Sequence, residues 1–374
     1  MPRDLKKGLA LSGGGFRATL FNLGSLWRLN ELGYLKTLDI ITSVSGGSIT
    51  SGVLALAWRN LEFSSDGVAQ KFTELVAKPV MDFCKLNVDL GAGLGGIFNI
   101  FESIPDEVAK KYDEELFHEA TLQDLPDETA PPNHPDFGPR FNFYATSLQT
   151  GSSVRMCRKR LADYKIGEIQ NPNTLLARVV GASSAFPPVL SPVVLKTKPS
   201  DWKRLDGAFL YDNEALRETM YLSDGGVYDN MGLEAIQDRC EVVLVSDAGA
   251  PLGVEESPSS EWTRMTLRVL DIITEQTRAL RRRQLVDDFK KNVRKGAYWG
   301  IRTKIGDYDL ADALAVDNDT TASLAAIRTR LNRFTDQEQG QLINWGYALT
   351  DAAMRKHVLT GAQKGTLPFP DYPL

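Results

Sequence analysis

The chain has 374 residues, of which 43% are hydrophobic and 24% charged, and its formal net charge is −5. These values are typical of a folded globular protein and allow one large α/β domain or two of moderate size. The net negative charge argues against binding to a nucleic acid polymer, and no apolar run reaches the roughly 18 residues expected of a membrane-spanning helix.

Cysteine usage and the N-terminal residues bear on the cellular location. Cys84, Cys157 and Cys240 are far apart and form no CxxC pair, so we expect no disulfide framework and no metal, and we also expect no cofactor. The first apolar run is short and soon broken by glycine, which argues against a signal peptide. We therefore expect a cytoplasmic protein whose contact with a membrane is peripheral, at its inner face.

The first sixty residues predict the order strand, helix, strand, helix. The first strand is expected over 9–12, and apolar residues at helical spacing follow over 16–32, up to Gly33 at a C-cap position. The second strand is expected over 38–44, and the second helix begins near Ile49. Such an order implies a parallel sheet covered by helices.

Two later runs, 141–148 and 240–249, also read as strands, and the helical stretch between them stops before paired prolines. After residue 254 the chain becomes rich in charges and predicts helices, notably over 278–300 and in a tail helix. We therefore expect an α/β core over 1–254 and a helical C-terminal extension over 255–374, packed on the same domain.

The stretch TSVSGGS places Ser45 between a predicted strand and a predicted helix. Small residues on both sides of a serine are typical of a nucleophile elbow, in which the backbone turns sharply and exposes the hydroxyl group. Ser45 is therefore a candidate nucleophile, although Ser43 stands where such elbows usually have a glycine. The alternative interpretation is an ordinary flexible loop.

Three consecutive glycines, Gly13, Gly14 and Gly15, lie between the first strand and the first helix. Backbone amides at a helix start favour negative charge and could form an oxyanion hole for Ser45. Alternatively, Gly13, Gly15 and Ala18 fit the G-x-G-x-x-A pattern of dinucleotide-binding proteins. That pattern needs an acidic residue at the end of the next strand, whereas Asp39 stands at its beginning.

A serine nucleophile needs a base. None of the three histidines, His118, His134 and His357, follows a predicted strand, so a Ser-His-Asp triad has little support. Asp224, which is followed by two glycines, is the candidate base because direct contact with the serine can compensate for the weak basicity of a carboxylate. The commoner meaning of Asp-Gly is a turn.

Together, the SGGGFR loop, the SVSGG elbow and the DGGVYDN motif resemble those of the patatin-like phospholipases, over about residues 7–250. The resemblance implies a three-layer α/β sandwich with a central, mostly parallel sheet and helices on both faces. It also implies a serine acyl hydrolase that releases fatty acids from glycerolipids. In that family the glycine loop forms the oxyanion hole and a Ser-Asp dyad, here Ser45 and Asp224, carries out catalysis.

Two assignments within the resemblance have alternatives. Asp206, in LDGAFLYDN, also fits the aspartate motif, but Asp224 is favoured because a helix and then the strand over 240–249 follow it. Arg17, the basic residue of the glycine motif, is expected to bind or orient the phosphate of the substrate. Alternatively, Arg17 only anchors the first helix.

Two segments could bring the chain to a lipid. The apolar, glycine-rich stretch 90–101 suits a lid or a wall of an acyl pocket, or an ordinary buried loop. The basic segment 278–295 could lie on an anionic bilayer, although packing of its apolar residues is the favoured interpretation.

Some bacterial relatives in the family are toxins or antiphage effectors that a ligand activates, so a ligand-activated, membrane-degrading effector is the first alternative function. A nucleotide-binding α/β enzyme is the second. A phospholipid membrane surface is the expected partner, while a small-molecule activator and a homo-oligomer stay open.

Overall fold

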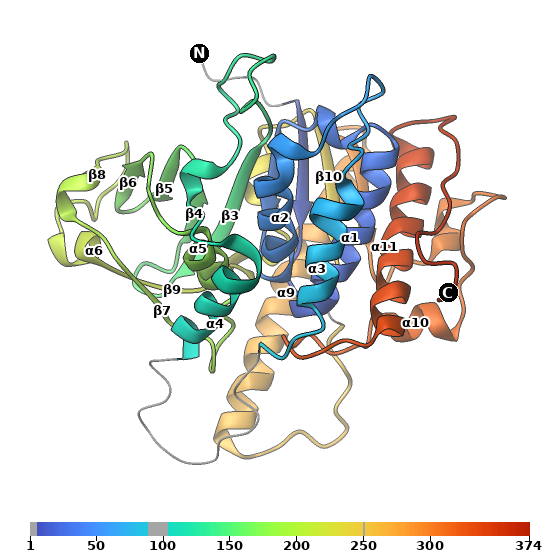
Figure 1. Cartoon of the computed structure of the whole chain (residues 1–374). Coiled ribbons are helices and arrows are strands. Elements are labelled where there is room, and N and C mark those ends of the chain that lie inside the picture. The colour runs from blue at the N-terminus through green and yellow to red at the C-terminus, as the bar shows by residue number, and fades with distance from the viewer. Residues whose placement is uncertain (1–5, 89–103, 250) are drawn as a thin grey trace.

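The computed structural model describes residues 6–88, 104–249 and 251–374. Its centre is a twisted sheet in the order β11-β10-β1-β2-β3-β4-β5-β6-β8 (Figure 1). The strands that pair in parallel are β1 (Lys7–Leu11), β2 (Ile40–Ser43), β3 (Arg140–Ser147), β10 (Val242–Asp247) and β11 (Lys295–Gly300). The antiparallel pairs add β4 (Ser153–Cys157), β5 (Arg160–Asp163), β6 (Gly167–Gln170), β7 (Val193–Lys196), β8 (Trp202–Lys203) and β9 (Thr219–Asp224).

Helices cover both faces of the parallel part of the sheet. One face carries α1 (Gly15–Glu31), α2 (Gly46–Ala57), α3 (Lys78–Phe83) and α11 (Asp336–His357), and the other carries α8 (Glu234–Gln237) and α9 (Trp262–Lys290). The remaining α-helices are α4 (Ile104–Tyr112), α5 (Leu176–Ser183), α6 (Glu214–Glu218), α7 (Gly226–Asp229) and α10 (Asp319–Leu324). Short 3₁₀ or π turns lie at Leu35–Thr37, Trp58–Asn60, Thr73–Ala77, Asp113–Phe117, Leu122–Asp124, Pro199–Asp201 and Ile305–Tyr308.

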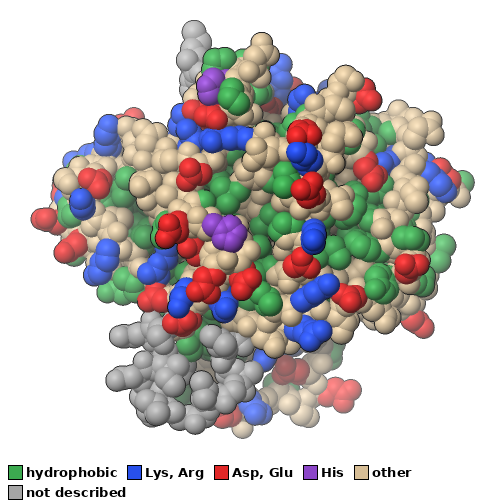
Figure 2. Space-filling view, in the orientation of Figure 1, with side chains coloured by type: hydrophobic (Ala, Val, Ile, Leu, Met, Phe, Trp, Pro, Cys, Tyr) green, Lys and Arg blue, Asp and Glu red, His purple; other side chains and the backbone are tan. Residues whose placement is uncertain are grey.

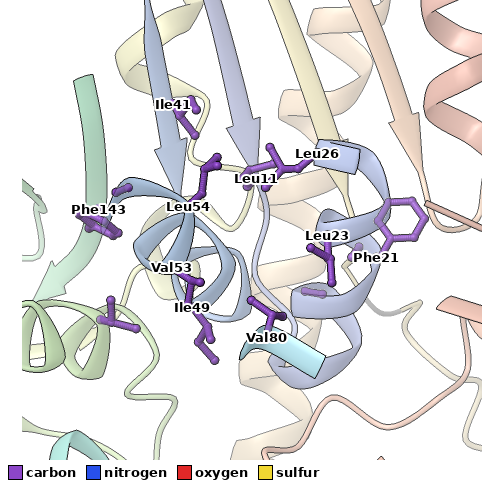
Figure 3. Packing of buried hydrophobic residues seen from close by; sticks show 14 of the residues in the cluster. Leu11, Phe21, Leu23, Leu26, Ile41, Ile49, Val53, Leu54, Val80 and Phe143 are labelled. Carbon is purple, nitrogen blue, oxygen red and sulfur yellow. The ribbon is translucent and has the colours of Figure 1, made fainter. Parts of the chain in front are cut away.

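Neighbouring side chains of the central strands point to opposite faces of the sheet, which explains why helices cover both faces. Leu11 and Ile41 point into the larger apolar cluster, which also holds the buried sides of α1 and α2 (Figure 3). Their strand neighbours Ala10 and Ile40 point the other way, into a second cluster that includes Leu285 of α9. Successive side chains of a strand face opposite sides of a sheet, so these strands are apolar on both sides. The predicted α/β class with helices on both faces is confirmed.

Most of the predicted elements are confirmed, with two differences. α2 begins at Gly46 rather than near Ile49, so both glycines of the elbow belong to its first turn. The helix predicted over 278–300 is wrong beyond Lys290, because Lys295–Gly300 form β11 beside β10. Charged residues at helical spacing continue almost to this strand, and only pairing with β10 distinguishes it from the helix before it.

The residues after 254 contribute to the same core as those before it. β11 extends the parallel part of the sheet, and α11 covers α1. In the basic segment 278–295, Leu285 is fully buried and Phe289 packs against the second apolar cluster, as the favoured packing interpretation expected. The division of the chain at residue 254 stays a prediction.

Two glycines allow α1 and α11 to pack with their backbones in contact. A Cβ atom at Gly24 would overlap the carbonyl group of Ile343, and one at Gly346 would overlap the carbonyl group of Phe21. Neither position tolerates a side chain, so α1 is enclosed between the sheet and α11. Gly15, the last glycine of the loop, is the first residue of α1, so this packing also fixes the position of that loop.

On the face seen in Figure 2, positive and negative side chains are mixed. In the view of Figure 2, Lys and Arg side chains alternate with Asp and Glu across the described part of the face. Among the helices described by the structure, none combines the length and apolar character required to cross a membrane.

Substitution of Gly346 tests the packing of α1 on α11. Helix propensity alone predicts that Gly346→Ala raises the free energy of unfolding by about 1 kcal/mol. We expect the opposite sign, a decrease of about 1–3 kcal/mol, because the new methyl group overlaps the Phe21 carbonyl. Urea denaturation measures the change. Gly253→Ala, at a position with no atom within 4 Å of the new Cβ, is the control, and stabilisation by Gly346→Ala would contradict this packing.

Candidate active site

Ser45 occupies the sharp turn between β2 and α2. Its φ of 52° and ψ of −122° lie in a region that residues other than glycine rarely adopt. Such strain is typical of a nucleophile elbow, in which the side chain is held at the carboxyl edge of the sheet. The backbone amide of Ser45 donates a hydrogen bond to Ser183 Oγ at 3.1 Å, which ties the turn to the end of α5.

The glycine loop packs directly on this turn. A Cβ atom at Gly46 would overlap the carbonyl oxygen of Gly15, and one at Gly13 would lie 2.9 Å from the Cβ atom of Ser45. Gly14 and Gly15 have φ values of 140° and 56°, which favour glycine. The three glycines are therefore required by the approach of the two loops and by the backbone conformation.

Asp224 reaches the same place from the other side. It is the last residue of β9, it is 2% exposed, and its side chain interacts with the hydroxyl group of Ser45. Its backbone is held on both sides, since its amide donates to the Ala185 carbonyl at 2.9 Å and its carbonyl accepts from Thr146 Oγ1 at 2.8 Å. The structure therefore brings together the predicted nucleophile and the predicted base, 179 positions apart in the sequence.

Burial changes the acidity of the aspartate. Loss of solvation raises the pKa of Asp224 to about 7, against the opposing effects of hydrogen bonds from the Gly226 amide and the Ser45 hydroxyl group. The Gly226 amide lies 2.7 Å from Oδ1 of Asp224. A carboxylate with this pKa is a much stronger base than an exposed one and suits proton transfer near neutral pH.

The three amides of the glycine loop are not equivalent. The amide of Gly13 donates to the carbonyl group of Asn230 at 3.0 Å, so it is already occupied. Within the described residues, the amides of Gly14 and Gly15 have no backbone or side-chain acceptor. Of the predicted oxyanion hole, Gly14 and Gly15 are thus the available donors, while Gly13 provides the space that Ser45 needs.

A cavity of about 610 Å³ contains Ser45, Asp224 and the glycine loop. One wall is apolar and includes Phe186, Val189 and Leu190, which follow α5. The opposite walls come from α9 and from residues 329–331, both outside the predicted core of 1–254. A cavity of this size with an apolar wall and charged residues on α9 suits an organic ligand that has both apolar and polar parts. The segment 90–101, predicted as a lid or pocket wall, lies outside the described residues.

Arg17 does not take the phosphate-binding position that was expected. It is 1% exposed, and its guanidinium group donates to the carbonyl groups of Ala325, Ile327 and Ala248 at 2.7 to 2.9 Å. Burial and the neighbouring Arg278 lower its pKa to about 10, although Asp247 opposes this change. The side chain is absent from the lining of the cavity. These hydrogen bonds join α1 to the segment before residue 331, while the buried Nε atom of Arg17 has no partner among the described residues. They favour the interpretation of Arg17 as an anchor, and its role stays a prediction.

The other candidates lie away from the cavity. Asp206 is an exposed residue in the turn between β8 and α6, so the structure separates it from Ser45. His118, His134 and His357 are also absent from the cavity lining. No group of three His, Cys, Asp or Glu side chains in the described parts of the chain is arranged to hold a metal ion.

Asp39 lies where the dinucleotide alternative cannot use it. Its Oδ2 atom accepts hydrogen bonds from the amides of Lys6 and Lys7, at the end of β1 opposite to the glycine loop. A ribose-binding acid would have to lie at the carboxyl end of β2, near Ser43. The arrangement therefore gives no support to a dinucleotide site.

Two residues of the site were not among the predicted functional residues. Ser183 accepts from the Ser45 amide and lies 2.8 Å from Ser48 Oγ, and Asn230 accepts from the Gly13 amide. Both lie in stretches that the sequence pattern marks, GASS and DGGVYDN. The sequence does not reveal that Ser183 and Asn230 each accept a hydrogen bond from a backbone amide of another loop, because these contacts join distant parts of the chain.

Comparison with known proteins identifies the family. Residues 9–236, more than half of the chain, match a model of the patatin-like phospholipases. The chain belongs to the patatin-like phospholipase family. The matched range contains the glycine loop, Ser45 and Asp224, whereas α9 and residues 329–331 follow it. Among curated proteins, no sequence matches significantly.

The solved structures that resemble this chain have low sequence identity to it. VipD from Legionella pneumophila is 16% identical, with a TM-score of 0.38 over 92% of this chain. Human GIVD cytosolic phospholipase A2 is 10% identical, with a TM-score of 0.48 over 93% of this chain. ExoU from the type III secretion system of Pseudomonas aeruginosa, solved with SpcU, is 14% identical, with a TM-score of 0.27 over 97% of this chain. The chain spans 66%, 61% and 76% of these three chains, respectively.

Because the pKa of Asp224 is raised, the free energy of unfolding should decrease as the pH rises. The folded protein binds this proton more tightly than the unfolded chain does, so deprotonation between about pH 4 and pH 7 lowers the free energy of unfolding. Asp224→Asn removes this ionisation. We expect the variant to be more stable than the wild type at pH 8, by on the order of a few kcal/mol, and the difference to shrink as the pH falls through that window.

Urea denaturation at several pH values measures the difference. Asp206→Asn, which alters an exposed carboxyl group, is the matched control and should follow the wild type at each pH. A gap between Asp224→Asn and the wild type that is constant from pH 4 to pH 8 would show that Asp224 does not ionise in this range.

Proposed function

We propose that the protein is a serine acyl hydrolase that releases fatty acids from glycerophospholipids, with Ser45 as nucleophile and Asp224 as its only base. The observation that carries the proposal is the meeting of a strained elbow serine and a buried aspartate of raised pKa in one cavity that has an apolar wall. Membership of the patatin-like phospholipase family supports the same class of reaction.

Acylation begins when Asp224 accepts the hydroxyl proton of Ser45 as Oγ attacks the ester carbonyl carbon. The tetrahedral intermediate collapses with breakage of the ester bond, and Asp224 returns the proton to the leaving alcohol, a lysophospholipid. Asp224 then accepts a proton from water, whose oxygen attacks the acyl-enzyme and releases the fatty acid, and the proton returns to Ser45. A base with a pKa of about 7 can both accept and donate this proton at neutral pH.

The amides of Gly14 and Gly15 are the proposed oxyanion donors. They lie at the start of α1, where the orphan amides of the first turn favour negative charge. Because the packing of Gly46 against Gly15 fixes both loops, these donors are in place before the charge develops.

The walls of the cavity support a lipid substrate. The apolar residues Phe186, Val189 and Leu190 line the same cavity as Ser45, where an acyl chain would be removed from water. A substrate of this kind resides in a membrane or a micelle, so we also propose a peripheral encounter with a phospholipid surface. Position and head-group selectivity are properties of the cavity walls and not of the dyad.

Substitution of the dyad tests the proposal directly. We expect Ser45→Ala to abolish both labelling by a fluorophosphonate probe and release of fatty acid from phospholipid vesicles, because both reactions need the serine oxygen. Asp224→Asn should lower kcat by about 10²-fold or more, since loss of a general base has effects of this size. Gel fluorescence and fatty acid analysis provide the two readouts.

Asp206→Asn is the matched control for the aspartate and should retain activity. Labelling of Ser45→Ala at the wild-type level would assign the nucleophile elsewhere. Labelling of the wild type without release of fatty acid from any phospholipid would keep the serine hydrolase and refute the lipid substrate.

The activity should depend on pH through Asp224. As a base, this residue must be ionised, so kcat/KM for a soluble short-chain ester should rise about tenfold per pH unit below about 7 and become constant above it. A series of initial rates from pH 5 to pH 9 measures the profile. A rate that is independent of pH between 5.5 and 8 would be incompatible with Asp224 as the base.

A further inference from the structure

The structure leaves one face of α9 uncovered. Its members, each between 39% and 73% exposed, are Trp262, Met265, Val269, Ile272, Ile273 and Leu280. We call them the outer face of α9. Among the described residues, no other helix has so many exposed large apolar side chains. Exposed apolar patches of this kind mark sites of interaction with a partner or a membrane.

The opposite side of the same helix lines the catalytic cavity. This inner face consists of Leu267, Arg268, Asp271, Thr274, Glu275 and Arg278. Met265 and Leu267, Val269 and Asp271, and Ile273 and Glu275 are each two positions apart, which is about 200° around a helix. α9 is therefore a wall with the candidate active site on one side and an uncovered apolar stripe on the other.

The position of α9 brings this stripe to the edge where the reaction would occur. Ser45 follows β2 at the carboxyl edge of the parallel strands, and Asp224 reaches the same level by pairing with Ala145 of β3. Figure 1 shows the N-terminal half of α9 projecting beyond the body of the protein. Trp262 is at the first position of the helix and is 73% exposed. Tryptophan is enriched where proteins enter the interface of a bilayer.

Charge follows the apolar part of the same face. Past Leu280, the exposed side chains at helical spacing are Arg283, Asp287 and Lys290, and Asp287 is paired with Lys291. An apolar distal part followed by a net positive charge suits an anionic bilayer, in which phosphates lie above the acyl chains. Leu285 lies on another side of the helix and packs against the second apolar cluster on the sheet. The outer face of α9 is therefore separate from the side that packs on the sheet.

We propose that the outer face of α9 inserts into the surface of an anionic phospholipid bilayer and holds the cavity at the membrane. The inference rests on the proposed lipid substrate. A second copy of the chain is the other occupant that such a stripe could accept. The apolar positions from Trp262 to Leu280 are interrupted at Gln276 and span fewer than three heptads, whereas three or four heptads are typical of a coiled-coil pair.

The experiment uses the full chain and vesicles of phosphatidylglycerol and phosphatidylethanolamine. Val269→Asp/Ile273→Asp places two carboxylates on the outer face and none in the cavity lining. We expect the partition coefficient on vesicles, measured by flotation, to fall at least about tenfold in this variant. Its hydrolysis of a soluble short-chain ester should equal that of the wild type, because neither residue lines the cavity. Phe209→Asp, at an exposed apolar residue outside α9, is the matched control and should bind vesicles like the wild type.

Flotation is repeated in the Ser45→Ala background, where no lipid is cleaved. Loss of binding in Val269→Asp/Ile273→Asp there supports the inference even if no ester proves to be a substrate. Conversely, equal vesicle binding by the variant and the wild type overturns the inference and leaves the dyad intact. Failure of the wild type to bind vesicles also overturns it. A dimeric mass in sedimentation that becomes monomeric in the variant, with vesicle binding unchanged, would assign the outer face to a second copy.

Discussion

Contact between the backbones of two turns is the constraint on which the candidate site depends. The turn after β1 and the turn after β2 approach so closely that Gly46 has no room for a Cβ atom beside the Gly15 carbonyl. This approach holds the strained Ser45 in place and sets the free amides of Gly14 and Gly15 beside it. A side chain at Gly15 or Gly46 would separate the proposed nucleophile from its proposed oxyanion donors, which explains the glycines at these positions.

The same constraint extends to the C-terminal residues. The carbonyl of Thr329 lies against Gly15, the amide of Phe16 donates to the Arg330 carbonyl, and Arg17 holds the segment before them. The glycine loop is thus enclosed between the elbow on one side and residues 329–331 on the other. These residues and α9 also line the cavity, although they lie outside the range that defines the family. The reactive groups and the walls that surround the substrate therefore come from different parts of the chain.

Sequence reasoning was successful where a local pattern has one structural meaning. Strands β1, β2, β3 and β10 and the elbow at Ser45 follow from apolar runs and from small residues at a turn. It was wrong for the strand Lys295–Gly300, which depends on pairing with the distant strand β10. It also did not reveal the partners of Arg17, the carbonyls of Ala325 and Ile327, for the same reason. The occupied amide of Gly13 has the same origin, since its acceptor belongs to Asn230.

The position of β1 has a consequence for how the protein is made. This strand lies between β2 and β10, and Ser12 Oγ at its end accepts from an amide 236 residues later in the chain. During synthesis at the ribosome, β1 and the apolar helix α1 must wait for β10, β11 and α11 before they are covered. Such long-range pairing delays folding and leaves apolar surface open to chaperones and to aggregation. It also means that the cavity is not complete until residues 329–331 have been synthesised.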